Sequence, residues 1–275
     1  MLQLNKHVFD LKRPLLMGIL NITPDSFSDG GKYLTLNEAL KRAHEMIEEG
    51  VDIIDIGGES TRPGSEPVSA NEELKRITPI IEALKKDSDI AISVDTYKAE
   101  VMKEAIDMDV AMINDVYALR QPGAIDVIKH SKVGICLMHM QGTPQTMQIN
   151  PQYTNVVNEV KLFLEARAND LVSEGIDKSR MILDPGFGFG KTFEHNIELL
   201  QHLESVQSVK LPLLVGLSRK SFIRKILSGE HDDHLSGSIA AAIFSVIKGA
   251  KILRVHDVKE TKSALKVINV AQGTA

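Results

Sequence analysis

The stretch MGILNITPDSFSDGG, residues 17–31, predicts a buried strand that ends at a polar residue and opens into a long loop. Its apolar first half suits a strand that is covered on both faces, as strands of parallel sheets are. The residues after it are rich in Pro, Ser, Asp and Gly, which favour turns. A strand that delivers polar side chains at its far end is the kind expected beside a binding site.

Seven more apolar segments repeat this arrangement, with amphipathic helical patterns between them. Eight strands, each followed by a helix, predict a single (β/α)8 TIM barrel with its active site at the C-terminal face of the strands. A doubly wound open sheet is the alternative, but eight regular units favour closure. No linker interrupts the pattern, so residues 1–275 are expected to form one domain, with 1–13 as a cap at the barrel bottom. The expected strands are 15–22, 52–57, 90–96, 111–116, 133–139, 181–186, 212–218 and 251–257, and the expected helices are 36–49, 71–86, 98–107, 122–131, 154–174, 195–204, 219–228 with 234–248, and 258–271.

Composition narrows the class of protein. The 275 residues are 43% hydrophobic, which is enough for a full core. A net charge of −5 provides no strong basic field, which argues against nucleic acid as a partner. No apolar run reaches membrane-spanning length, and the first residues lack the apolar region of a signal peptide. The only cysteine, Cys136, lies in an apolar run, so an inert core thiol and a cytoplasmic location are expected.

Polar residues gather at the C-terminal ends of the proposed strands. Any one of them could be a turn or capping residue, but in a barrel these ends meet on one face, where the active site lies. The set comprises Asn21, Asp55, Asp95, Asn114, His139, Asp184, Ser218, Arg254 and His256. So many polar residues at one mouth indicate a site.

Two carboxylates and an amide, Asp95, Asn114 and Asp184, would lie deep in this mouth. They suit a planar ligand rich in N–H donors, because a carboxylate accepts two parallel hydrogen bonds from a guanidine-like edge. The alternative is that Asp95 or Asp184 pairs internally with Lys220 or Arg254, since buried charges must be paired.

An anion site is expected where the last strand meets the first. Arg254 and His256 are two residues apart, so both would point into the mouth. Barrels often bind phosphate in this region, and closure brings Asn21 alongside. Asn21 could also offer an oxygen to Mg²⁺, an ion that is often held by phosphate and few protein oxygens.

Two polar loops complete the predicted mouth, and a glycine-rich segment lies after the sixth strand. Residues 23–33 and 57–69 suit mobile lids over a phosphorylated substrate, although ordinary connectors would have similar compositions. The segment DPGFGFGK, residues 184–191, lacks the spacing of a P-loop. Its glycines are expected to permit a tight turn over a planar ligand, with Phe187 or Phe189 near it.

Taken together, the motifs resemble those of the dihydropteroate synthase family. They occur in the family's order and cover nearly the whole chain. The motifs are MGILNITPDSFSDGG (17–31), IIDIGGESTRPGSEPVS (53–69), SVDT (93–96), INDV (113–116), LMHMQGTP (137–144), LDPGFGFGK (183–191), LVGLSRKSFI (214–223) and LRVHDV (253–258).

The resemblance implies a transferase of folate biosynthesis. Such enzymes join 4-aminobenzoate to (7,8-dihydropterin-6-yl)methyl diphosphate, with Mg²⁺, and release dihydropteroate and diphosphate. The aromatic amine is already nucleophilic, so the main task is to stabilise the departing diphosphate, and a dissociative displacement is expected. No side-chain nucleophile is needed.

The resemblance also implies residue roles. The pterin would lie against Asp95, Asn114 and Asp184, and the two loops would close over the diphosphate and aminobenzoate. The implied catalytic residues are Asn21, Asp29, Arg62, Lys220, Arg254 and His256, with Asn21 as the metal ligand; the implied substrate-binding residues are Phe27, Thr61, Pro63, Asp95, Asn114, Asp184, Phe189, Ser218, Lys220, Arg254 and His256.

Two other functions deserve comparison. A folate-dependent methyltransferase domain would also need the pterin-binding carboxylates, but it has no need for the Arg254 and His256 anion site or the first loop. A non-catalytic pterin-binding homologue would be expected to lack Lys220, Arg254 or Asn21, and this chain has all three.

The segment SGSIAAAIFSVIKGA, residues 236–250, is apolar around most of its circumference. An outer barrel helix normally has a charged face as well as an apolar one. Neighbouring barrel helices could cover the second face. We favour a two-fold homodimer that buries this helix, in keeping with the family resemblance.

Overall fold

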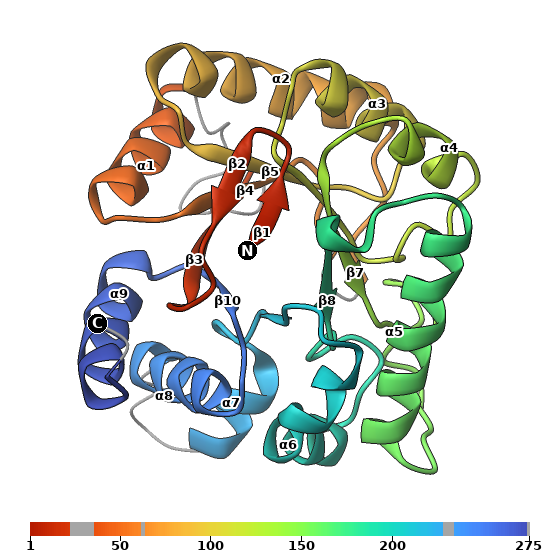
Figure 1. Ribbon diagram of the computed structural model, residues 1–275, viewed down its shortest axis with the longest axis vertical. Coiled ribbons are helices and arrows are strands. Elements are labelled where there is room, and N and C mark those ends of the chain that lie inside the picture. Colours follow the sequence, from red (N-terminus) through yellow and green to blue (C-terminus); the bar gives the residue numbers. More distant parts are fainter. Residues whose placement is uncertain (23–35, 62–63, 228–233, 274–275) are drawn as a thin grey trace.

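The computed structural model describes residues 1–22, 36–61, 64–227 and 234–273, and within them eight parallel strands form a closed barrel (Figure 1). Hydrogen-bonded neighbours run in the order β8-β7-β6-β5-β4-β3-β10-β9. A parallel bridge between Leu183 and Leu213 joins the two outer strands and completes the circle. The predicted TIM barrel is confirmed. The strands are β3 Leu15–Asn21, β4 Ile53–Gly57, β5 Ala91–Asp95, β6 Met112–Asp115, β7 Gly134–Met138, β8 Met181–Asp184, β9 Leu214–Val215 and β10 Ile252–Val255.

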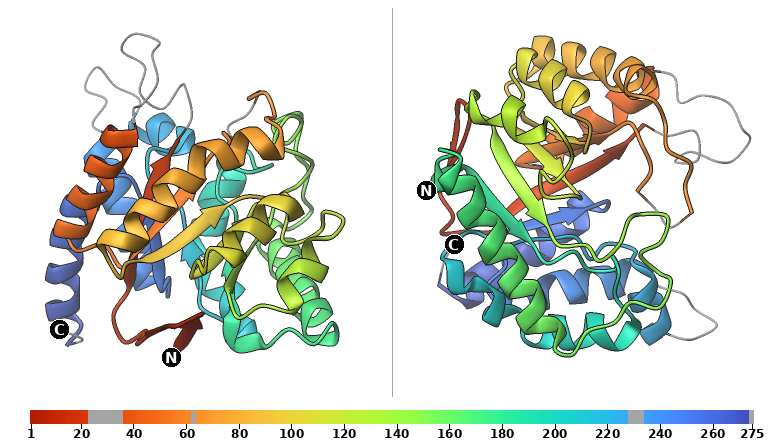
Figure 2. Two further views of the ribbon diagram at one scale, coloured as in Figure 1. Left: turned by 90° about the horizontal axis from the view of Figure 1, so that it is seen from above. Right: turned by 90° about the vertical axis from the view of Figure 1, so that its right-hand side faces the viewer.

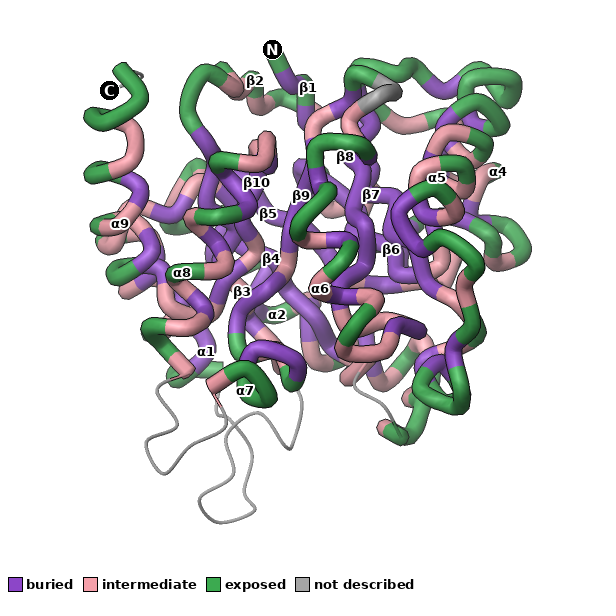
Figure 3. Tube along the Cα trace, turned by 90° about the horizontal axis from the view of Figure 1, so that it is seen from below, coloured by how far each residue is buried: buried purple, intermediate pink, exposed green. Residues whose placement is uncertain are grey.

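Helices surround the strands and turn their apolar sides inward, so that the buried strands lie at the centre (Figures 1 and 3). Local capping fixes several helix starts: the Ser69 hydroxyl accepts the backbone N–H of Glu72 at 3.2 Å. The helices are α1 Leu36–Glu48, α2 Ala70–Asp87, α3 Ala99–Asp107, α4 Ala124–Lys129, α5 Val156–Ser173, α6 Phe193–Gln201, α7 Ser221–Leu227, α8 His234–Ile247 and α9 Val258–Ala271.

The sequence boundaries hold within a few residues except at two places. The seventh barrel strand, expected over 212–218, is regular only at Leu214–Val215. Pro212 has no N–H to donate, and its carbonyl oxygen accepts the N–H of Leu183 at 3.0 Å instead. The helix expected over 195–204 begins earlier, because Thr192 and His195 form a capping box, and it gives way to a 3₁₀ segment over Leu203–Val209.

An N-terminal hairpin packs against one end of the barrel. β1, Leu2–Leu4, pairs antiparallel with β2, His7–Phe9. Leu2 and Leu4 are buried in the core cluster that contains Met17 and Cys136 from inside the barrel. A Cβ on Gly134 would collide with the Leu4 side chain, so the glycine makes room for this plug. Figure 2 shows the hairpin at the end opposite the C-terminal ends of the strands.

None of the described helices is both long and apolar enough to cross a membrane.

We expect Leu4→Ala to lower the free energy of unfolding by about 2–5 kcal/mol, because the fully buried Leu4 side chain fills the barrel bottom. Urea denaturation followed by circular dichroism measures this loss. Val8→Ala is the matched control, since Val8 is on the same hairpin and 53% exposed. Equal effects of the two substitutions would contradict the assigned plug.

Candidate active site

The structure brings the predicted carboxylates and amide together at the C-terminal ends of the strands. Asp95 ends β5 and is the register partner of Asn114 on β6, while Asp184 ends β8. Asn114 is 6% exposed and Asp184 is 7% exposed. The three side chains therefore line the inside of one mouth, as a buried polar floor.

Arg254 lies on this floor and joins its Asp95 carboxylate to a further buried carboxylate, that of Asp55. Its Nε donates to Asp55 Oδ2 at 2.6 Å, and a terminal guanidinium nitrogen donates to Asp95 Oδ2 at 2.7 Å. The Asn114 amide also donates to Asp55 Oδ2, at 3.2 Å. Internal pairing of Asp95 with Arg254, which the sequence left open, is therefore present in this structure. Asp55 is fully buried; it was predicted to lie at the mouth but was assigned no role there.

The position of Asp55 could be predicted from the sequence, but its partner could not. It lies two residues before Gly57, so the two-residue period of β4 points both positions toward the same side. A buried carboxylate in that position needs a cationic partner, but the two-residue strand period does not show which cationic side chain reaches it from across the barrel. The second oxygen of Asp55, Oδ1, is buried and has no hydrogen-bond partner among the described residues.

Burial shifts the pKa values of the groups on the floor. It raises the pKa of Asp95 to about 7, although Arg254 opposes this shift. Burial also raises the pKa of Asp184, against the Gly186 N–H that donates to Asp184 Oδ1 at 2.7 Å. Burial, together with the nearby Arg254, lowers the pKa of Lys220 to about 8. Three carboxylates thus face two cations, which favours a ligand that brings N–H donors.

Lys220 lies above the ring of Phe189, with its Nζ 4.4 Å from the ring centroid. Of the two phenylalanines in the glycine-rich segment, Phe189 therefore lies at the mouth beside a predicted site residue. Phe187 is in the core instead, 1% exposed and stacked on Phe222 with centroids 6.2 Å apart.

Lys191 holds the glycine-rich segment in shape. Its buried Nζ donates to the carbonyl oxygens of Gly186 at 2.9 Å and Phe189 at 3.1 Å, and lies 2.9 Å from His139 Nδ1. Burial lowers the pKa of Lys191 to about 7. Gly186 has φ +69°, and a Cβ there would collide with the carbonyl oxygen of His139. Lys191, to which the sequence analysis assigned no role, is thus engaged with the segment's own backbone.

His256 lies beside the floor and is oriented by Ser218. Its Nδ1 is 3.0 Å from Ser218 Oγ, and its backbone N–H donates to the same oxygen at 3.3 Å. Burial lowers the pKa of His256 to about 3, and the nearby Arg219 adds to this shift. The imidazole is therefore neutral at pH 7. Arg254, expected next to His256 in an anion site, points instead to the floor carboxylates.

Asn21 occupies the end of β3 beside Asp95. A Cβ on Gly57 would lie 3.3 Å from Asn21 Oδ1 and 3.6 Å from the Asp95 Cβ, so Gly57 leaves room for both side chains. The described residues contain no group of three or more His, Cys, Asp or Glu side chains that could hold a metal ion. A divalent cation here would thus need ligands from the substrate as well as Asn21, an arrangement that suits Mg²⁺.

Four predicted site residues lie outside the described residues: Phe27 and Asp29 of the first loop, and Arg62 and Pro63 of the second. Thr61 is described and is partly buried at the start of the second loop.

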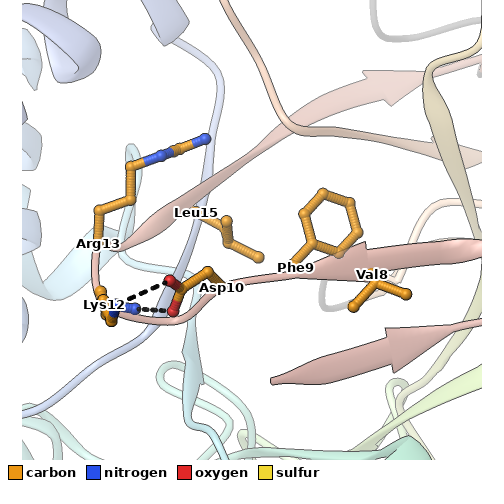
Figure 4. Close-up of a pocket in the computed structure, with 6 residues that line it drawn as sticks. All are labelled: Val8, Phe9, Asp10, Lys12, Arg13 and Leu15. Carbon is orange, nitrogen blue, oxygen red and sulfur yellow. Dashed lines mark hydrogen bonds and ion pairs between the residues drawn. The ribbon is translucent and has the colours of Figure 1, made fainter.

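A cavity of about 360 Å³ lies at the N-terminal end of the barrel (Figure 4). Its cations are already paired with acids: Arg13 contacts Asp52 at 2.6 Å, and Lys12 is 3.6 Å from Asp10. The cavity is on the hairpin side, away from the polar strand ends. It does not compete with the mouth as the candidate active site.

We expect the His256 imidazole to remain neutral between pH 5 and 8, because burial disfavours its charged form. An NMR titration of the imidazole carbons, with His256→Gln to assign the signal, measures this. In the unfolded chain the same group takes up its proton near pH 6.5, so its contribution to stability is lost as the pH falls below that value. A midpoint near 6.5 in the folded protein would contradict the assigned environment.

Comparisons with known proteins agree with this geometry. A family model described as pterin binding enzyme matches residues 17–256. The dihydropteroate synthase of Haemophilus influenzae is 50% identical over 263 residues, which is 96% of each chain. The structure of Xanthomonas albilineans dihydropteroate synthase with 4-aminobenzoic acid has a TM-score of 0.92 and 45% identity, covering 98% of this chain and 97% of that one. The same enzyme in complex with 7,8-dihydropteroate has a TM-score of 0.88 and 43% identity, covering 98% of both chains. The chain therefore belongs to the pterin-binding enzyme family, among its dihydropteroate synthases.

Proposed function

We propose that this protein condenses (7,8-dihydropterin-6-yl)methyl diphosphate with 4-aminobenzoate to give 7,8-dihydropteroate and diphosphate. The observation that carries the proposal is the buried floor of Asp95, Asn114 and Asp184 at the barrel mouth, with Lys220 beside it. Relatives of the same fold bind 4-aminobenzoic acid and 7,8-dihydropteroate. The reaction is a group transfer in folate biosynthesis.

The floor suits the pterin's aminopyrimidine edge. That edge presents N–H donors and one carbonyl oxygen, which carboxylates and an amide can match. Asp184 accepts the Gly186 N–H with Oδ1, so its Oδ2 can accept a hydrogen bond from the ligand. Asp95 accepts from Arg254 with Oδ2, so its Oδ1 can do the same. Lys220, over the Phe189 ring, can donate to the carbonyl side of the ligand. Phe189 can also cover part of the ring.

Cleavage of the C–O bond to diphosphate is the difficult step, because the neutral aromatic amine of aminobenzoate is already nucleophilic. We propose a dissociative displacement in which charge departs with the diphosphate before the amine attacks. Asn21 and His256 offer hydrogen bonds to the leaving group, and the cationic Arg254 provides favourable charge close by. The electron-rich pterin ring stabilises the positive charge left on its methylene carbon.

We propose that Asn21 contributes one oxygen to a Mg²⁺ ion held mainly by the diphosphate. When bound, the ion would neutralise part of the negative charge on the leaving group. The described residues contain no group of three or more His, Cys, Asp or Glu side chains that could hold the ion, so the diphosphate would supply most of its ligands.

Diphosphate release that requires both substrates is the decisive assay. A methyltransferase or a non-catalytic pterin-binding protein would bind the pterin and release no diphosphate in response to 4-aminobenzoate. A coupled phosphate assay with each substrate omitted in turn separates these functions. Release without aminobenzoate, or none with both substrates, would refute the proposal.

Asp184→Asn should weaken binding of the pterin diphosphate about tenfold or more, with the fold intact. The amide places a donor where the ligand presents N–H groups, and a mismatched buried group costs about 1–3 kcal/mol. Isothermal titration calorimetry measures the loss. Asp126→Asn is the control, because that carboxylate is on the surface of α4 and 74% exposed. Unchanged affinity in Asp184→Asn would remove Asp184 from the pterin floor.

We also propose a single-domain, cytoplasmic homodimer. Barrel elements account for residues 15–271, and the buried Cys136 thiol suits a reducing compartment. On α8, Phe244 is 40% exposed and Ile247 is 56% exposed, and both lie on one side of the helix. A second copy that covers this side would remove two large apolar side chains from water.

Phe244→Glu should therefore convert the protein to a monomer, because a charge on this side of α8 would be buried in the dimer. Sedimentation velocity at micromolar concentration gives the oligomeric state. Leu162→Glu is the matched control, because Leu162 is a 52% exposed residue of α5, on another side of the barrel (Figure 1). A monomeric wild-type protein would show the dimer proposal to be wrong.

A further inference from the structure

A buried cluster of charged residues lies beside the mouth and was absent from the sequence predictions. The ammonium of Lys98 lies between the carboxylates of Glu59 and Glu73, in contact with Glu59 and 2.5 Å from Glu73 Oε2. The Tyr97 hydroxyl donates to Glu59 Oε1 at 2.8 Å. The exposed fractions of the Lys98, Glu59 and Glu73 side chains are 14%, 7% and 1%.

This cluster is an expensive way to stabilise a fold. Two carboxylates share one ammonium in a place largely removed from water, and apolar residues of the same volume often serve stability as well. Burial raises the pKa of Glu73, which shows how costly its charged form is. The cluster does fix the relative positions of the segments that carry it, because each residue must keep its place for the charges to remain paired.

The cluster joins three parts of the chain that meet at the second loop. Glu59 follows Gly57 and Gly58 at the start of that loop. Glu73 is in the first turn of α2, just after the loop ends. Tyr97 and Lys98 come two and three residues after Asp95, on the segment that leaves β5.

Two further hydrogen bonds fix the same stretch of backbone. Arg76, on α2, donates to the carbonyl oxygen of Gly58 at 2.8 Å. The Ser65 hydroxyl donates to the carbonyl oxygen of Ser60. Residues 58–60 are therefore held from α2, from the segment after β5 and from the far part of the loop. Thr61 is the next residue along the chain.

We propose that Glu59, Glu73, Tyr97 and Lys98 form a clamp that positions Thr61 over the pterin floor. They are positioning residues, because they act through Thr61 and do not touch the substrate. The proposal rests on the proposed substrate-binding role of Thr61. Because Lys98 lies on the same short segment as Asp95, the clamp ties the place where aminobenzoate binds to the strand that carries the pterin contact.

Glu59→Gln is the main test variant, since it keeps the shape and removes one of the two negative charges. Its amide presents N–H donors toward the Lys98 ammonium, so the clamp should loosen. We expect the KM for 4-aminobenzoate to rise about tenfold, while the dissociation constant for pterin diphosphate changes less than about twofold. Tyr97→Phe should produce a smaller change of the same kind. Lys103→Met is the matched control, because Lys103 pairs with Asp107 on the exposed side of α3 at 2.7 Å.

Hydrogen exchange of the amides of residues 58–61 provides a readout that does not depend on activity. We expect these amides to exchange faster in Glu59→Gln and at the wild-type rate in Lys103→Met. Equal losses for both substrates, or an unchanged KM for 4-aminobenzoate in folded Glu59→Gln, would overturn the clamp. Failure of the wild-type protein to release diphosphate would refute the proposed reaction instead, and the exchange result would still decide whether the clamp exists.

Discussion

The Arg254 guanidinium, between Asp55 and Asp95, is the contact on which the arrangement of the mouth depends. It reaches from β10 across the barrel interior to β4 and β5, so it fixes three strands relative to one another. Without it, Asp55 and Asp95 would lose the cation that donates hydrogen bonds to both of them. Removing one partner of a buried ion pair leaves the other charge buried and uncompensated, which is strongly destabilising. The three residues therefore behave as one unit.

The neighbouring groups respond to the same lack of water. Burial raises the pKa of Asp95 and Asp184 and lowers the pKa of Lys220. Burial thus disfavours the charged forms of the groups that would meet the pterin, and a ligand with N–H donors can supply the hydrogen bonds that water would otherwise provide. A preorganised polar floor of this kind needs little rearrangement when the ligand arrives.

Much of the fold could be predicted, because apolar strands and amphipathic helices leave periodic patterns in the sequence. The order of the elements and the polar ends such as Asp184 followed directly from these patterns. The partners of those polar residues could not be predicted, because a period of two shows that Arg254 points inward without showing which carboxylate it reaches. For the same reason the roles of Lys191 and Lys98 were missed: each contacts residues from segments far away in the sequence, or backbone oxygens that any residue could offer. The family resemblance supplied residue roles that local patterns alone leave open.

The plug formed by Leu2 and Leu4 makes the barrel a dead end. Molecules that enter between the C-terminal ends of the strands have to leave by the same opening. In the proposed reaction the pterin lies deepest, against Asp184, and the aminobenzoate rests nearer the surface beside Thr61. The pterin substrate would therefore have to bind before the aminobenzoate, because aminobenzoate bound first would obstruct the way to the pterin floor. In the proposed reaction the assembled product has to leave through the same opening by which its two substrates came in.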